Sequence, residues 1–225
     1  MTSEEVLASL RSEAGSTKHA ETSSWVAAQL RQRIADGLLA PGAKLAEEAL
    51  REALGVSRNT LREAFATLHA ERVVTRIPNR GVFVSHPTAE DIQEIYRVRR
   101  LVEPASLLWS PAGPTAPLAE IVRAAQKAAK AGDVPAMASA NQEFHRALVA
   151  RAGSERLDSL MEQILAEMRL VFASMAADPR FHAPYVEDNA AILGLLEAGR
   201  HAEAADFMVD YLGRAEQQLL AAVAR

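Results

Sequence analysis

The feature that most constrains the fold of this chain is a helix start followed by a short hairpin, in residues 55–84. A glycine ends one short helical stretch, and Ser57 suits the N-cap of the next helix because its hydroxyl can accept a hydrogen bond from the Thr60 N–H. Two β-branched runs, residues 72–76 and 81–84, then flank a turn. This order predicts a helix-turn-helix that is completed by a small β-hairpin.

The helix that begins at Ser57 has one apolar face and one polar, basic face. The apolar positions recur at helical spacing and predict the buried face; they are Leu61, Ala64, Phe65 and Leu68. Arg58, Asn59 and Arg62 lie on the other face, near the N-terminus, where a recognition helix presents side chains to base edges. Arginine pairs well with guanine, and asparagine with adenine. The competing interpretation is a capped, solvated helix whose arginines contact nothing.

The hairpin after this helix supplies a second set of candidate contacts. Asn79 and Arg80 lie in its turn, where they can reach phosphate or a minor groove, and Gly81 permits a close approach. The candidate DNA-binding residues are therefore Ser57, Arg58, Asn59, Thr60, Arg62, Asn79, Arg80 and Gly81.

Charge is distributed unevenly along a chain whose net charge is −4. Residues 18–86 carry 10 Lys and Arg against 7 Asp and Glu, whereas residues 87–225 carry 14 against 19. A basic segment followed by an acidic one is typical of a polyanion-binding module joined to a second domain. So small an excess also occurs on ordinary solvated surfaces, so it supports DNA binding only together with the basic helix face.

From residue 88 onward the periodicity is that of helices alone. Helices are expected over 88–109, 117–131, 134–151, 154–176, 185–198 and 201–224, separated by PAGPTAP, AGD, Gly153-Ser154, DPRFHAP and Gly199. Pro104 lies inside the first of them and is expected to kink it. We therefore expect a mostly α protein. Residues 1–19 form a flexible N-terminal arm, residues 20–86 a winged helix-turn-helix domain with a small β-hairpin wing, and residues 87–225 an all-α bundle of about six to seven helices.

Composition excludes several other classes of protein. Cysteine is absent, which leaves neither a disulfide framework nor a thiolate metal site. No apolar run approaches the roughly 20 residues that cross a bilayer, and the N-terminal stretch is too polar and acidic for a signal peptide. We therefore expect a cytoplasmic protein that does not bind a membrane.

Residues 20–85 resemble the winged-helix DNA-binding domain of GntR-type regulators. The resemblance rests on QLRQRIADGLLAPGAKL, on EEALREALGVSRNTLREAF and on the RGVFV wing, and it covers the whole first domain. Asn59-Thr60 stands where Thr-Pro is frequent, and Glu48 stands where Arg is common. The resemblance implies a homodimer that binds double-stranded DNA at a near-palindromic operator.

The helical half resembles the FCD effector domain of the FadR-type subfamily of these regulators. The matching stretches are EIYRVRRLVEPAS (94–106), NQEFHRALVARAG (141–153) and DNAAILGLLEAGRHAEAADFMVDYL (188–212). This resemblance implies a small, usually dimeric helical bundle that senses a small organic acid or a related metabolite and then releases DNA.

Polar residues interrupt the apolar faces of four of the expected helices. These candidate effector-binding residues are Arg99, Asn141, His145, Asn189 and Tyr211. Their convergence predicts a polar cavity inside the bundle, because buried polar groups need partners. We expect Arg99 to hold an effector carboxylate through two parallel hydrogen bonds. The alternatives are an internal pair between Arg99 and Glu103, and a closed cavity in which the amides bond one another.

The second resemblance also implies a metal ion, which we do not expect this chain to hold. Many such domains bind a divalent cation through an Asp or Asn and three His, and the corresponding positions here are Asn141, His145, Asn189 and Tyr211. A neutral amide is a poor donor to zinc or nickel, and a phenol must lose a proton of pKa about 10 to bind well. The sequence therefore predicts no tight metal site and no cofactor. A different helix register would bring in His182 or His201.

These features favour a DNA-binding transcriptional regulator, more often a repressor in this family, whose operator affinity depends on a small, carboxylate-bearing metabolite. The alternative is an architectural DNA-binding protein whose helical domain serves only for dimerisation. An enzyme is not supported, because the sequence offers no nucleophile–base pair, no glycine loop for phosphate and no paired carboxylates in the apolar faces.

Overall fold

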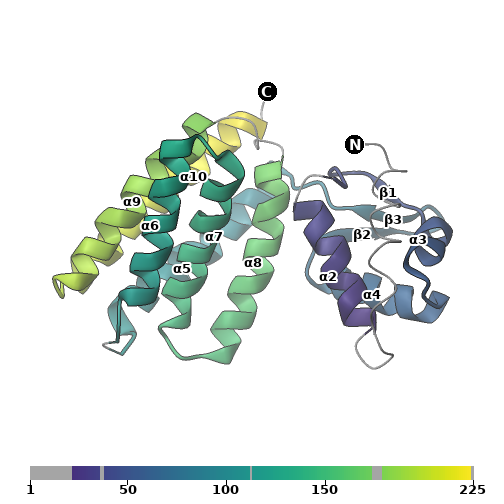
Figure 1. The fold of residues 1–225 in the computed structure, drawn as a ribbon, viewed down its shortest axis with the longest axis horizontal. Helices are drawn as coiled ribbons and strands as arrows, with labels where there is room; N and C mark the ends of the chain where they lie inside the picture. Colours follow the sequence, from purple (N-terminus) through teal and green to yellow (C-terminus); the bar gives the residue numbers. More distant parts are fainter. Residues whose placement is uncertain (1–21, 36–37, 112, 174–178, 224–225) are drawn as a thin grey trace. The chain divides into compact units, whose positions relative to one another are not determined.

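The chain divides into two compact units, and the main boundary between them falls at Pro87–Thr88. The computed structural model describes residues 22–35, 38–111, 113–173 and 179–223. The arm expected over residues 1–19 lies outside these ranges. Within them the protein is mostly helical with one small sheet, as the sequence predicts (Figure 1).

The first unit is a helix-turn-helix with a wing. Its elements are α2 (Thr22–Ala35), β1 (Lys44–Leu45), α3 (Glu47–Leu54), α4 (Arg58–Ala70), β2 (Val74–Ile77) and β3 (Gly81–Val84). Helix α2 packs against α4, and α3 contacts the same helix. The three strands form an antiparallel sheet in the order β1-β3-β2.

The turn between α3 and α4 forms for local reasons. Gly55 ends α3 in the left-handed region, at φ 65°, and its backbone N–H bonds back to the last turn. Two residues later the Ser57 hydroxyl accepts a hydrogen bond from the Thr60 N–H at 3.1 Å, which confirms the expected N-cap. The start of α4 is therefore fixed by the sequence itself.

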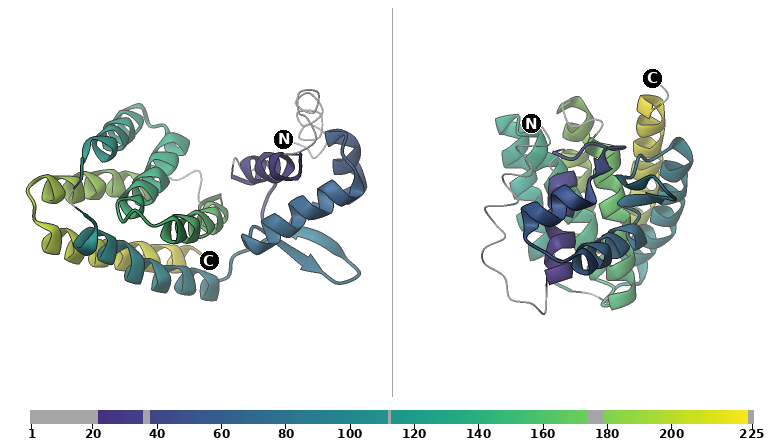
Figure 2. Two further views of the ribbon diagram at one scale, coloured as in Figure 1. Left: turned by 90° about the horizontal axis from the view of Figure 1, so that it is seen from below. Right: turned by 90° about the vertical axis from the view of Figure 1, so that its right-hand side faces the viewer.

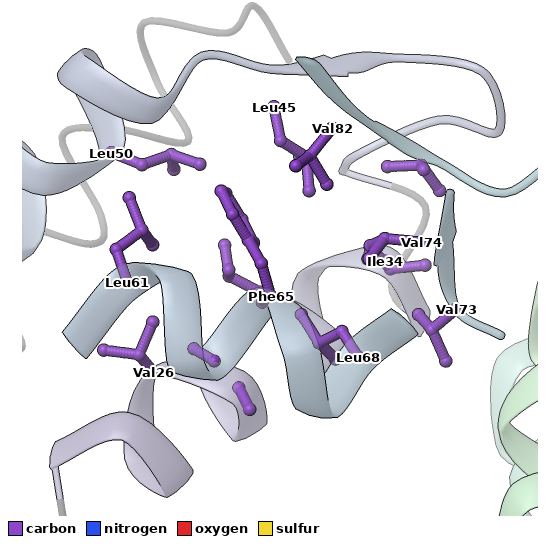
Figure 3. Close-up of a cluster of buried hydrophobic side chains, with 14 of the residues drawn as sticks. Val26, Ile34, Leu45, Leu50, Leu61, Phe65, Leu68, Val73, Val74 and Val82 are labelled. Carbon is purple, nitrogen blue, oxygen red and sulfur yellow. The ribbon is translucent and has the colours of Figure 1, made fainter. Parts of the chain in front are cut away.

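A single apolar core holds the first unit together. Leu61, Phe65 and Leu68 are fully buried on α4, as the helical spacing predicts. Figure 3 shows Phe65 between side chains from α3, the sheet and α4 itself, with Val26 and Ile34 of α2 also facing this core. Burying one such side chain stabilises a fold by about 1.5–3 kcal/mol. The polar face of α4 is thereby turned away from the core.

The sheet has one strand more than the expected hairpin. Lys44 pairs with Phe83 and Leu45 with Val82, on the opposite side of β3 from β2. Pro41-Gly42 is a turn signal, so the sequence alone predicts a turn in residues 38–45. Two strand residues are too few to show a period-two pattern, so this edge strand was missed.

The second unit is a helical bundle. Its helices are α5 (Ala89–Trp109), α6 (Ala116–Ala131), α7 (Val134–Ala150), α8 (Glu155–Ala173, which belongs to this unit up to Leu165), α9 (Pro179–Glu197) and α10 (His201–Val223). Helix α5 lies along α10, which the two views of Figure 2 also show, and both α6 and α7 pack against α9. None of the described helices is both long enough and apolar enough to span a bilayer. A capping box of Thr88 and Asp91 begins α5, which carries the candidate effector residue Arg99.

Helix α9 begins earlier than the sequence analysis expected. DPRFHAP was interpreted as a loop, with a helix over 185–198, but α9 already includes residues from Pro179. Proline is tolerated in the first turn of a helix, where its missing N–H would have no partner in any case. Burial of Phe181 in the bundle favours the additional turns in spite of Pro184.

Candidate DNA-binding and effector sites

The polar face of α4 and the wing border one open groove. Its volume is about 590 Å³, and its lining residues are Glu47, Arg58, Arg62, Arg76, Ile77, Pro78, Asn79, Gly81 and Val82. Four of the predicted DNA-binding residues, Arg58, Arg62, Asn79 and Gly81, therefore lie on one surface. A groove between a recognition helix and a wing suits a polyanionic strand.

The arginines of this groove differ from Arg31 and Arg51 of the first unit. Among the described residues, neither Arg62 nor Arg76 has a carboxylate partner, and Arg58 has only a long contact of 3.4 Å with Glu47. Arg31 and Arg51 are instead closely paired, with Glu71 at 2.6 Å and with Glu48 at 2.5 Å. The cations beside α4 and the wing therefore remain accessible to phosphate or base edges.

Several of the predicted residues, Gly81 of the groove among them, have local structural roles, and Asn59 lies exposed in the first turn of α4. The Ser57 hydroxyl, besides capping α4, lies 2.8 Å from the Thr60 hydroxyl. The guanidinium of Arg80 lies over the ring of Phe83, at 5.9 Å from its centroid. Gly81 has φ 114°, a conformation that side chains rarely adopt, so glycine is required here by the backbone.

Sequence reasoning missed Arg76 and Glu47 as groove residues. Arg76 lies in β2, opposite Val82, and it precedes the turn on which the sequence analysis concentrated. Arg76 lies near the end of a strand that leads into a basic turn, and this position could have identified it as a groove residue. Glu47 begins α3, and its distance from α4 along the chain concealed its contact with Arg58.

Arg76→Ala is expected to weaken DNA binding without changing sequence preference. A strand residue that contacts phosphate releases about one counterion, so the slope of log affinity against log salt should fall by about 0.9. Fluorescence anisotropy with a random-sequence duplex over a salt series measures this slope. Arg97→Ala, at an exposed arginine of the second unit, is the control and should leave the slope unchanged. An unaltered slope in Arg76→Ala would remove Arg76 from the interface.

A continuous hydrogen-bonded network crosses the interior of the second unit. Glu103 of α5 accepts from Arg99 Nε with one oxygen at 2.6 Å and from His145 Nδ1 with the other, also at 2.6 Å. The Tyr211 hydroxyl of α10 lies 3.0 Å from His145 Nε2. The network therefore joins α5, α7 and α10 through side chains that are all buried.

The two amides extend this network to α9. Tyr211 donates to Asn141 Oδ1 at 2.9 Å, and Asn189 Nδ2 donates to the same oxygen at 2.9 Å. The structure thus brings together all five predicted effector residues, in the register that the sequence favoured. It also contains a contact from each alternative that the sequence left open, because Arg99 pairs with Glu103 and the two amides bond each other.

Burial determines the protonation states of the network. Burial alone would raise the pKa of Glu103, but Arg99 and His145 lower it to about 2. Burial lowers the pKa of His145, although Glu103 opposes this shift. Burial also raises the pKa of Tyr211 well above its usual value. At neutral pH the network therefore holds one cation, Arg99, and one anion, Glu103.

Two buried atoms of the network lack partners. Among the described residues, neither Arg99 Nη2 nor Asn189 Oδ1 has a hydrogen-bond partner. Both side chains are only 2% exposed. A buried polar atom without a partner costs about 1–3 kcal/mol, so each of these two atoms is a candidate contact for a ligand or an ordered water.

The donors at this place do not suit a metal ion. One imidazole is present, and both of its nitrogens are engaged, with Glu103 and with Tyr211. The raised pKa of Tyr211 opposes loss of the phenolic proton. His201, a ligand in the alternative register, instead lies 3.2 Å from the Leu107 carbonyl. In the described part of the chain no three His, Asp or Glu residues gather as a metal site would require.

Protein purified without chelator is therefore expected to carry no stoichiometric zinc, nickel or manganese. Elemental analysis by plasma mass spectrometry measures this directly, and His145→Ala is the matched comparison. Near-stoichiometric metal in the parent protein that disappears in His145→Ala would contradict the prediction.

A winged helix with unpaired arginines, followed by a helical unit with a buried polar network, defines a class of DNA-binding regulator. Residues 22–84 match the family described as bacterial regulatory proteins, gntR family, and residues 94–214 match the FCD domain. The chain therefore belongs to the GntR family of transcriptional regulators and carries an FCD domain. This family consists of transcriptional regulators and not of enzymes. The sequence-based predictions of a transcriptional regulator and of a protein that is not an enzyme are therefore confirmed.

Known relatives agree with this assignment. A GntR transcriptional regulator from Rhodococcus sp. RHA1 is 41% identical, with a TM-score of 0.83 over 88% of this chain and 97% of that chain. The HTH-type transcriptional regulator McbR of Escherichia coli is 26% identical over 82% of this chain and 86% of its own. A solved structure of McbR has a TM-score of 0.76 at 23% identity, with coverage of 89% and 98%, and supports the fold alone. The gluconate operon transcriptional repressor of Bacillus licheniformis is 39% identical over 37% of this chain and 34% of its own length.

Proposed function

We propose that this protein is a cytoplasmic repressor that binds a near-palindromic operator as a homodimer and leaves it when a small polar metabolite binds in the helical unit. The exposed arginines of the groove beside α4 and the wing support the DNA contact, since Arg62 and Arg76 have no carboxylate partner among the described residues and Arg58 has only a long one. The relative that represses a gluconate operon supports repression rather than activation. A pair of winged helices related by a two-fold axis suits two half-sites.

The observation that carries the effector proposal is the buried network with its two unpartnered atoms. A helical unit that served only for dimerisation would have no reason to bury Arg99 Nη2 and Asn189 Oδ1 without partners. Buried polar groups are usually satisfied, and exceptions are concentrated where a ligand or water binds. The network also connects four of the packed helices, α5, α7, α9 and α10, so a ligand there can change their arrangement.

The test has two stages. Repeated selection from a random-sequence duplex pool identifies the operator, and anisotropy then measures operator affinity in the presence of a panel of small polar metabolites. We expect at least one metabolite to lower operator affinity, and Arg99→Ala to lose this response. An architectural protein would bind DNA equally well with every compound. An unchanged response in both Arg99→Lys and Arg99→Ala would make Arg99 a purely structural residue.

A further inference from the structure

The charges of the buried network cancel one another. Arg99 and Glu103 form an ion pair of 2.6 Å within α5, and Glu103 is fully buried. His145 and Tyr211 are neutral, because burial lowers the pKa of the imidazole and raises the pKa of the phenol. A carboxylate that entered this site would bring a second negative charge beside Glu103. Two carboxylates at one buried site cannot both stay ionised without compensation.

The network also has acceptors that its own donors do not satisfy. Glu103 accepts the Nδ1 hydrogen of neutral His145, so the other ring nitrogen is an acceptor. Tyr211 has one hydroxyl hydrogen for two acceptors, His145 Nε2 at 3.0 Å and Asn141 Oδ1 at 2.9 Å. Asn189 Oδ1 has no donor at all among the described residues. A carboxylate has no hydrogen to give to any of these atoms.

We propose that the effector presents an uncharged group with both an acceptor and a donor, such as a carboxamide or a hydroxy-carbonyl, and that Glu103 imposes this choice. Its oxygen accepts from Arg99 Nη2, and its N–H or O–H donates to Asn189 Oδ1. This inference rests on the proposed function, because it names the chemical class of that same effector. It replaces the carboxylate that Arg99 alone led us to expect.

The geometry of the ion pair explains why Glu103 does not satisfy Arg99 completely. A carboxylate can bind a guanidinium through two parallel hydrogen bonds. Glu103 instead directs its second oxygen to His145, so that Arg99 donates to it through Nε and retains Nη2. The charge of Arg99 is thus neutralised while a donor remains. Such a site distinguishes an uncharged acceptor from an anion.

Matched pairs of simple acids and amides test the proposal in the full chain. The probes are acetate and acetamide, propionate and propionamide, and benzoate and benzamide, with ionic strength held constant by sodium chloride. The measured quantity is the probe concentration that gives half of the maximal rise in thermal midpoint. We expect this concentration to be lower for the amide than for its acid by on the order of tenfold or more.

Glu103→Gln is expected to reverse this order. The substitution removes the negative charge and leaves Arg99 uncompensated, so a carboxylate then supplies the missing charge and raises the midpoint more than the amide does. Glu94→Gln, at an exposed glutamate of the same helix, is the control and should keep the parent order. The comparison of acids with amides is also made on the parent protein alone. The test therefore does not depend on the folding of the variant.

Three results would overturn the inference. They are a parent protein that prefers the acids, an unchanged order in Glu103→Gln, and no response to any probe in either protein. The proposed function fails differently, when no metabolite in the broader panel changes operator affinity. A metabolite that releases DNA while the acids outrank the amides would keep the function and reject the inference.

Discussion

The double variant Arg58→Ala, Arg62→Ala is expected to fold normally and to lose selective operator binding. Each arginine that reads a base contributes on the order of 1–3 kcal/mol, so the loss for both is roughly 2–6 kcal/mol if they act independently. Both residues line the groove beside the wing, and neither belongs to the apolar core of the first unit. Alanine also has the higher helix propensity, so α4 should remain intact.

The measurement is anisotropy with the selected operator and with a scrambled duplex of equal length. Loss of a base contact lowers operator affinity more than scrambled-duplex affinity, whereas loss of a phosphate contact lowers both equally. Far-UV circular dichroism establishes that the helices are retained. Arg97→Ala is the charge-matched control, since its arginine is exposed in the other unit. Retention of full affinity and selectivity by the double variant would reject α4 as the recognition helix.

The two arginines should also differ from each other. Arg58 approaches Glu47 at 3.4 Å through Nε, which leaves its terminal nitrogens for a base edge, while Arg62 has no such contact among the described residues. An exposed pair of this kind contributes about 0–1 kcal/mol to stability. The contact with Glu47 orients the Arg58 side chain. We therefore expect Arg58 to account for more of the sequence selectivity of DNA binding and Arg62 for more of its salt dependence.

Much of the fold follows from local signals in the sequence. The Ser57 cap and the apolar spacing of α4 specify that helix without reference to the rest of the chain. The missed features depend on tertiary contacts. Strand β1 exists because Leu45 pairs with β3, and the first turns of α9 exist because Phe181 is buried. Neither contact has a periodic signature in the sequence.

The buried polar network was predictable in its membership but not in its connections. Polar residues on apolar helix faces identify Arg99 and His145, and helical spacing identifies Glu103 as a partner of Arg99. Sequence spacing does not reveal that Glu103 uses its second oxygen for His145, which lies 42 residues away. That contact decides which atom of Arg99 remains for a ligand. The expectation of a carboxylate effector was drawn from Arg99 and Glu103 alone, without this contact to His145.

The largest stability effect is expected when Glu103 is replaced by an apolar residue of similar volume. Glu103→Leu leaves the Arg99 guanidinium buried without its counter-charge and removes the acceptor for His145 Nδ1. Removal of one partner of a buried ion pair typically costs about 3–5 kcal/mol. Urea unfolding followed by circular dichroism should show this loss. Replacement of both partners, in Arg99→Met, Glu103→Leu, should recover most of it, because two apolar side chains leave no uncompensated charge.

The pH dependence of Glu103→Gln provides an independent check on this ion pair. The pKa of Glu103 in the folded protein is about 2, below its ordinary value of 4.5. The unfolded chain therefore takes up this proton first, and the stability that ionised Glu103 provides is complete above pH 4.5 and is lost as the pH falls toward 2. The difference in unfolding free energy between parent and Glu103→Gln should shrink over that interval and stay constant above it. A difference that does not change with pH across this interval would mean that Glu103 stabilises the bundle by packing and not by its charge. Full recovery of the unfolding free energy in Arg99→Met, Glu103→Leu would also be compatible with that result. The double variant therefore tests the pair as a whole, and the pH dependence tests the charge of Glu103.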